Sequence, residues 1–331
     1  MAYRLKANES VPKAVTRTVL EEVKSATDGL TARNGNRDEA IHEARKSVKK
    51  VRGVLRLMRP ELGKTYDLEN QRFRDIGHEL SEIRDAAALL EIFDRVAEKY
   101  QHSLQKDALS GIRKGLEDAK AETEQAVNID RAATDAIRAF RQAGKNVKTW
   151  QLKDDGFAAI APGLELTYRA GRTALKRVKN RPTPENYHYL RRRAKDHWYH
   201  VRLLESLWTE VQKAHENSLD ELQNWLGDEH NLVVLHQKFA QDPEKYGDKE
   251  QVQLFCSLSE QEQKQLRANA VSLAERIFEQ KPKQFMASMK KLWTAWQRQP
   301  ASMKRVQKQQ RDVRKKSGAP AAHSAAHHAT A

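Results

Sequence analysis

Apolar residues recur at intervals of three and four along almost the whole chain, which is the spacing of one face of an α-helix. One stretch shows the pattern clearly, because its apolar positions would all share one side of a helix: Ile41, Ala44, Val48, Val51, Leu55 and Met58. Only 14 of the 331 residues are Gly and 9 are Pro, and most of them lie in a few places. A many-stranded β fold needs turn residues more often, so the sequence predicts an all-α protein.

Interruptions of this pattern predict where helices begin and end. Ser10 and Thr183 are suitable N-caps, Pro184 stands at a first helical position, and Pro60 ends a helix. Gly156, Pro162 and Gly163 in the segment from Asp154 to Gly163 predict a junction between two halves. We expect helices at residues 11–28, about 38–59, 66–100 with an interruption near Ser81, 104–127, 129–143, 164–179, 184–208, 212–226, 232–239, 251–278 and 285–296.

The chain also matches itself when it is shifted by 146 residues, which places His42 on His188. Further pairs in the same ungapped register are Arg45 and Arg191, Lys46 and Arg192, Lys49 and Lys195, Arg56 and Arg202, Leu57 and Leu203, Leu80 and Leu226, Asp85 and Asn231, and Leu89 and Leu235. Such agreement predicts two related helical bundles facing each other about a pseudo-twofold axis. We therefore expect a first half at residues 1–150 and a second half at residues 151–300.

Residues 301–331 differ in character, since Lys, Arg and Gln dominate and are followed by Ala, Pro and His. This composition cannot bury enough apolar surface to offset the entropy of ordering the chain. We expect residues 301–331 to be a disordered basic tail.

Positive charge is concentrated on one helix face of the first half. Lys and Arg number 60 against 45 Asp and Glu, a net charge of +15, which favours anionic partners without identifying them. Between Ile41 and Arg59 only Glu43 is acidic, although like charges one helical turn apart cost about 0.2–0.5 kcal/mol per pair. Steps of three and four residues place six side chains on one face, which we name the first basic stripe: His42, Arg45, Lys49, Arg52, Arg56 and Arg59.

The second half carries the corresponding second basic stripe, which consists of His188, Arg191, Lys195 and Arg202, with Arg192 beside it. The preceding helix adds Arg169, Arg172, Lys176 and Lys179 at the same spacing. A solvated face on a basic protein is the alternative interpretation. The repeated geometry and the shortage of carboxylates favour a phosphate-binding surface, because the Arg fork can hold two phosphate oxygens and Lys acts as a point charge.

These elements together resemble the CHAD family, a histidine-containing α-helical domain, from about Tyr3 to Trp296. The resemblance is carried by the pattern His-x-x-Arg-Lys-x-x-Lys-Lys-x-Arg at His42–Arg52, and by Arg84–Asp85, Tyr168–Arg172, Leu190–Lys195 and Leu222–Gly227. It implies two four-helix bundles around a basic central cavity, and binding of inorganic polyphosphate, often at polyphosphate granules, without catalysis. The chain departs from the family at His197, Trp198 and Asn231, where an apolar residue, Arg and Asp are usual.

We therefore expect one group of residues to bind polyphosphate: His42, Arg45, Lys46, Lys49, Lys50, Arg52, Arg56, Arg169, Arg172, Lys176, His188, Arg191, Arg192, Lys195 and Arg202. Asp85 and Asn231 are expected to support them, with Asp85 orienting an arginine of a basic stripe. His42 and His188 have two possible roles, since each could donate to a phosphate or bond to a neighbouring backbone group.

Other functions remain open at this stage. The same stripes would neutralise a nucleic-acid backbone, and aromatic residues near the second stripe could stack on bases. A phosphohydrolase would need carboxylates in the cavity, and no P-loop, Gly-x-Ser-x-Gly or paired acid cluster occurs, so we expect no catalytic residue and no cofactor.

His197 and His200 lack a nearby carboxylate ligand, so we expect no metal. We expect a cytoplasmic protein, because the sequence contains neither a secretory signal nor a run of about 18 apolar residues. The family resemblance adds the expectation that the protein is associated with polyphosphate granules. The oligomeric state stays open.

Overall fold

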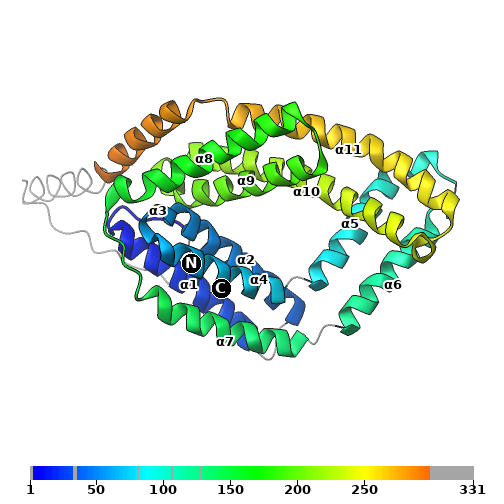
Figure 1. The fold of residues 1–331 in the computed structure, drawn as a ribbon, viewed down its shortest axis with the longest axis horizontal. Helices are drawn as coiled ribbons and strands as arrows, with labels where there is room; N and C mark the ends of the chain where they lie inside the picture. The colour runs from blue at the N-terminus through cyan, green and yellow to red at the C-terminus, as the bar shows by residue number, and fades with distance from the viewer. Residues whose placement is uncertain (1–2, 33–35, 81, 106, 127–128, 299–331) are drawn as a thin grey trace, which may run out of the picture.

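A computed structural model describes residues 3–32, 36–80, 82–105, 107–126 and 129–298, without the side chains of residues 82–85 and 126. This part of the chain is helical and contains no strand, which confirms the all-α prediction (Figure 1). Its helices are α1 (Val11–Thr31), α2 (Arg37–Leu57), α3 (Arg59–Leu62), α4 (Lys64–Glu79), α5 (Glu82–Tyr100), α6 (Ser110–Ala126), α7 (Ile129–Val147), α8 (Gly156–Asn180), α9 (Pro184–Leu203), α10 (Thr209–Gln241), α11 (Lys249–Ile277) and a last helix at residues 282–298. Three short 3₁₀ turns, Gln101–Ser103, Glu205–Leu207 and Pro243–Tyr246, lie between them. The predicted tail lies outside the described residues.

Several predicted helix starts are confirmed by their caps. The Ser10 hydroxyl accepts from the Lys13 amide at 3.5 Å, and the Thr183 hydroxyl accepts from the Asn186 amide at 3.4 Å. The predicted apolar stripe of α2 is confirmed as well, because all six of its members, from Ile41 to Met58, are buried. The buried stripe fixes where the basic face of α2 points.

Other predicted boundaries are wrong. The sequence predicted a helix that ends at Pro60, but α2 ends at Leu57 and Pro60 stands in the first turn of the short helix α3. The predicted junction at Pro162–Gly163 is the interior of α8, which begins at Gly156. The predicted break between residues 226 and 232 is absent, since α10 is continuous from Thr209 to Gln241. Local residue preference is thus a weak guide to these boundaries, and at Gly163 a packing contact decides the outcome.

Gly163 illustrates such a contact. A Cβ placed on Gly163 would lie 1.8 Å from the carbonyl oxygen of Leu57, at the end of α2. Glycine is therefore required for α8 to pass over the end of α2, and it does not mark a break in the helix.

The 146-residue repeat is visible in the helix boundaries. Shifted by 146, the starts of α1, α2 and α4 each fall within one residue of the starts of α8, α9 and α10. Continued further, the register places α5 on the second part of α10, α6 on α11, and α7 on the helix at residues 282–298. The pseudo-twofold relation between the two halves stays a prediction.

Two apolar clusters hold the helices together. The larger cluster joins α1, α2, α4 and α7 to α8, α9, the first part of α10 and the helix at residues 282–298. The second cluster joins α5 and α6 to the second part of α10 and to α11, where the Phe93 and Phe255 rings stack with centroids 5.1 Å apart. Figure 1 shows α5 and α6 extending from the first half to the far ends of α10 and α11. Both clusters contain residues from either side of residue 150, and the predicted division into halves as domains stays a prediction.

Three neutral histidines are packed into the second half. His197 and His200 are fully buried, and neither ring nitrogen of His197 has a hydrogen-bond partner among the described residues. His200 Nε2 donates to the carbonyl oxygen of Gly53 at 3.1 Å. Burial lowers the pKa of His197 well below its ordinary value, that of His200 to about 3, and that of His215 to about 4.

We expect Gly163→Ala to lower the free energy of unfolding by about 2 kcal/mol or more, because the new methyl group collides with backbone that cannot move aside. Gly29→Ala in α1 is the matched control, since a Cβ placed on Gly29 would meet nothing within 4 Å, and it should leave stability unchanged or raise it by up to about 1 kcal/mol. Urea unfolding of both variants tests the contact, and equal stabilities would contradict it.

The buried histidines predict a loss of stability in acid. Their folded pKa values lie below the unfolded value of about 6.5, so the unfolded chain takes up more protons as the pH falls below 6.5. The contribution of each of these histidines to the free energy of unfolding should therefore be constant above pH 6.5 and should decrease below it, down to the folded pKa, by about 1.4 kcal/mol per pH unit. Replacing His197 by Leu should reduce this slope by one proton. A slope equal to that of the unaltered protein would exclude His197 as a source.

Candidate functional site

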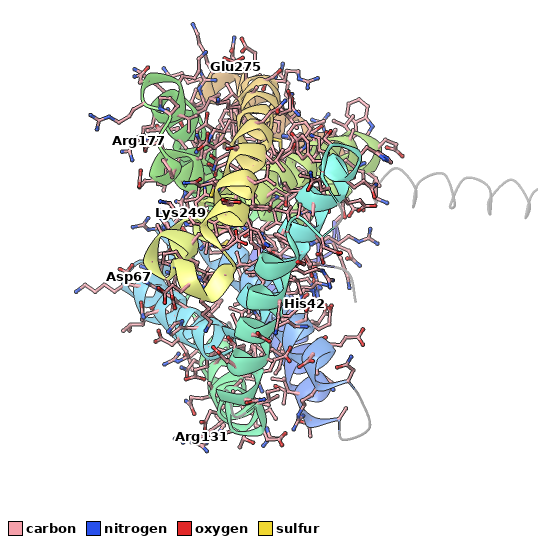
Figure 2. All side chains as sticks on the ribbon, turned by 90° about the vertical axis from the view of Figure 1, so that its right-hand side faces the viewer. His42, Asp67, Arg131, Arg177, Lys249 and Glu275 are labelled. Atoms are coloured by element: carbon pink, nitrogen blue, oxygen red, sulfur yellow. The ribbon has the colours of Figure 1, made fainter. Side chains whose placement is uncertain are left out.

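The two basic stripes border one cavity. Its volume is about 1530 Å³, and it is lined by residues of α2, α5, α6, α9 and α10 and by Tyr246. Figure 2 shows His42, one of the lining residues, near the middle of the molecule, between Arg131 at one end and Glu275 at the other. The cavity is thus bordered by both sequence repeats.

One wall of the cavity is basic and is built by α2 and α9. The structure brings nine of the predicted residues into the lining: His42, Arg45, Lys46, Lys49, Lys50, Arg191, Lys195, Arg202 and Asn231. All except Asn231 come from α2 or α9, whose apolar faces are buried in the larger cluster.

The pKa of Lys195 reflects the closeness of the positive charges on α2 and α9. Burial, together with the charges of Arg191 on its own helix and Arg45 on α2, lowers the pKa of Lys195 to about 8, while Asp220 acts in the opposite direction. Arg45 and Lys195 lie 150 residues apart in the chain, yet the charge of one is felt by the ammonium group of the other. The two helices therefore act on one shared electrostatic field.

Part of the basic wall is balanced by carboxylates. Lys50 Nζ lies 2.9 Å from Oε1 of the buried Glu22. The other carboxylate oxygen of Glu22, Oε2, accepts from the Ser47 hydroxyl at 2.8 Å. Arg202 Nε lies 3.0 Å from Glu216 Oε1. These pairs hold their cations in place at the edge of the cavity.

Other predicted residues lie outside the lining of this cavity. Arg56 pairs with Asp196 of α9 at 3.0 Å, and Asp196 also pairs with Arg193 at 3.0 Å. Arg192 lies over the Tyr189 ring at 5.8 Å, and Arg52 lines a separate hollow between α2 and α4. The side chain of Asp85 lies outside the part of the chain that the structure describes, so its predicted role is not addressed.

The predicted cations of α8 do not line the cavity. Arg169 pairs with Glu165 of its own helix at 2.6 Å, and Lys176 is exposed. Arg172 donates to the carbonyl oxygens of Phe278, Glu279 and Gln280, where α11 ends. Carbonyls at the end of a helix lack partners within that helix, so Arg172 stabilises the end of α11.

His188 lies behind the cavity wall. Its ring is 4.4 Å from the ring of His230, which does line the cavity, and its Nδ1 atom is buried without a hydrogen-bond partner among the described residues. Burial lowers the pKa of His188, and it lowers that of His230 to about 4, with a further contribution from the neighbouring Arg191. Among the histidines of the second half, His230 faces the cavity where the sequence predicted His188.

On the α10 side of the cavity, the sequence predicted Asn231 alone. The lining residues of α10 lie along one side of the helix: Asp220, Gln223, Asn224, Gly227, Asp228, His230, Asn231, Val234 and Lys238. This pattern would have been visible if α10 had been predicted as one helix. Four carboxylates that the sequence did not place in the cavity also line it: Asp220 and Asp228 of α10, and Glu91 and Asp94 of α5.

These carboxylates make the cavity asymmetric. Asp228 forms a two-pronged ion pair with Arg95, at 2.5 and 2.8 Å, on the side of α5. No group of three or more His, Cys, Asp or Glu able to hold a metal occurs in the described parts of the chain. A polyanion would therefore lie along α2 and α9, where cations are in excess, and away from α5.

Within the described residues no helix has the length and apolar character to span a membrane.

Comparison with known proteins places the chain among helical relatives. A family model described as the CHAD domain matches residues 14–240. The crystal structure of the CHAD domain from the plant Ricinus communis is similar, with a TM-score of 0.59 and 19% sequence identity over 84% of this chain and 95% of that one. At this identity the likeness supports the fold alone. No curated protein matches the chain.

We expect the Lys195 side chain to titrate near pH 8, well below the ordinary lysine value of 10.5. Replacing Arg191 by Gln removes a neighbouring positive charge and should raise this pKa. NMR of the lysine ammonium groups, assigned with Lys195→Arg, measures both midpoints. A midpoint near 10.5 in the unaltered protein would show that Lys195 is neither buried nor crowded.

Proposed function

Because the chain belongs to the CHAD domain family, we propose that it binds inorganic polyphosphate along the basic wall formed by α2 and α9, and that it does so without catalysing a reaction. Association with polyphosphate granules is part of this proposal. The observation that carries it is the convergence of the two stripes, since the charge of Arg45 on α2 lowers the pKa of Lys195 on α9.

The chemistry of the wall suits a linear polyanion. Polyphosphate presents a continuous row of charged oxygens, so it can bridge the cations of α2 and those of α9 with one chain. Without a ligand, the crowded cations raise one another's energy and favour deprotonation of Lys195. A bound polyanion removes this cost, because each phosphate lies next to several positive charges.

The aromatic residues of the cavity favour polyphosphate over nucleic acid. The Arg202 guanidinium covers the Trp198 ring at 4.5 Å, and Tyr199 and Tyr246 are buried. Single-stranded nucleic acids are held largely by stacking of bases on aromatic rings. With these rings covered, the cavity offers cations for phosphates and few surfaces for bases.

The absence of catalysis is proposed from the positions of the cavity carboxylates. Phosphoryl transfer is commonly assisted by Mg²⁺ held by carboxylates beside the phosphates. Here Asp228 is engaged by Arg95, and the described residues provide no three-membered metal-binding group.

A competition experiment tests the proposed function. Labelled polyphosphate is bound to the protein and challenged with unlabelled polyphosphate, RNA or DNA, while phosphate release is followed in the presence of Mg²⁺ or Mn²⁺. We expect displacement by polyphosphate at far lower concentrations than by RNA or DNA, and no release of phosphate. Equal displacement by nucleic acid would favour a nucleic-acid binder, and turnover would show an enzyme.

Charge reversal on either wall helix should damage binding. We expect Arg45→Glu with Lys49→Glu, and separately Arg191→Glu with Lys195→Glu, to weaken polyphosphate binding at least about tenfold, or about 1.4 kcal/mol. The two pairs come from different repeats but face one cavity. Each should also reduce the salt dependence of binding, since fewer counterions are exchanged.

The matched control is Arg169→Glu with Lys176→Glu on α8. It changes the net charge by the same amount at residues that do not line the cavity, and we expect less than about a threefold effect. Circular dichroism confirms that every variant is folded. An equal loss in all three double variants would mean that net charge, and not the cavity, governs binding.

A further inference from the structure

A second hollow lies between α2 and α4, and its position relative to the cavity is informative. Its volume is about 490 Å³. We name it the α2–α4 groove, and its lining consists of Arg45, Val48, Lys49, Arg52, Gln71, Arg74, Asp75, Gly77 and His78. Arg45 and Lys49 line both the groove and the central cavity, so the two hollows adjoin along α2.

The groove is formed by close packing of two helices. Val48 is buried, and a Cβ placed on Gly77 would lie 3.2 Å from Val48 Cγ1. Glycine at this position therefore lets α4 lie close to α2 and keeps the space above them open. The α4 side of the lining comes from one helix face, because residues 71, 74, 75 and 78 are three or four positions apart.

Positive charge dominates this groove. Its lining contains four Lys or Arg side chains and one carboxylate, Asp75, which already accepts from the Gln71 amide at 2.7 Å. Arg52 is half-buried at the α2 side, and its Nε atom donates to the neutral Oδ1 atom of Asn70 at 3.1 Å. Burial and the nearby charge of Arg56 lower the pKa of Arg52 to about 10, so an anion beside Arg52 would relieve a crowded charge.

We propose that the α2–α4 groove is a second polyanion subsite, which binds the part of a polyphosphate chain that extends beyond the cavity and passes over Arg45 and Lys49. This inference rests on the proposed function and adds a path for long chains. A chain confined to the cavity gains nothing from the groove, whereas a longer chain gains the charges of Arg52 and Arg74.

The test compares binding across a ladder of polyphosphate lengths in the full-length protein. Arg74→Glu changes an exposed residue that lines the groove and not the cavity, and Arg74→Gln removes its charge without reversal. Arg141→Glu, at an exposed residue of α7 outside both linings, is the control with the same change in net charge. Circular dichroism of each variant verifies folding.

We expect Arg74→Glu to bind the shortest chains as tightly as Arg141→Glu does, and to bind the longest chains at least about fivefold more weakly. For long chains alone, the slope of log affinity against log salt should fall in magnitude by about one, the value expected for one lost phosphate contact. Arg74→Gln should show a smaller change in the same direction.

Two other outcomes would overturn the proposal in distinguishable ways. If the unaltered protein binds polyphosphate and the effect of Arg74→Glu equals that of Arg141→Glu at every length, or is the same for short and long chains, the groove is not a subsite and the proposed function stands. If the unaltered protein binds no chain of any length, the proposed function fails and this inference fails with it.

Discussion

The crossing of α2 and α9 is the contact on which the cavity depends. Gly53 allows the approach, since a Cβ at this position would lie 2.6 Å from the Cβ of Tyr199. At the same crossing His200 donates to the carbonyl oxygen of Gly53, and Arg56 pairs with the buried Asp196. Each helix by itself would present a solvated basic face. Packed together, they direct both rows of cations towards one space, where each row raises the energy of the other.

The free energy gained by apolar packing elsewhere in the fold outweighs this repulsion between cations. The buried faces of α2 and α9 belong to one apolar cluster, and carboxylates such as Glu22 and Glu216 neutralise cations at the edge of the cavity. Burial and the neighbouring arginines instead lower the pKa of Lys195 to about 8. The stability gained by packing thus offsets the electrostatic cost of holding these cations together, so the site proposed for a polyanion is formed before any ligand arrives.

Periodicity in the sequence was sufficient for the fold class and for the basic wall, because both depend on which side of one helix a residue occupies. It was insufficient where a residue's role depends on a distant segment. The spacing of Arg172 matches that of a stripe residue, but its guanidinium binds carbonyls at the end of α11, more than 100 residues away. Gly163 resembles a helix break until the carbonyl of Leu57 is placed beside it. The predicted break in α10 was also wrong, and it concealed Asp228 and His230 on the α10 side of the cavity.

The two repeats have diverged in a way that bears on the α2–α4 groove. The 146-residue register places Trp198 opposite Arg52, Asp220 opposite Arg74, and Gln223 opposite Gly77. A cation has thus been replaced by an indole covered by Arg202, another by a carboxylate, and the open glycine by a buried side chain. Cavity residues at the corresponding positions, such as Arg45 with Arg191 and Lys49 with Lys195, remain cationic in both repeats. Arg52 and Arg74 are thus cationic in the first repeat alone, so the positive charge that they give to the groove has no counterpart at the corresponding positions of the second repeat.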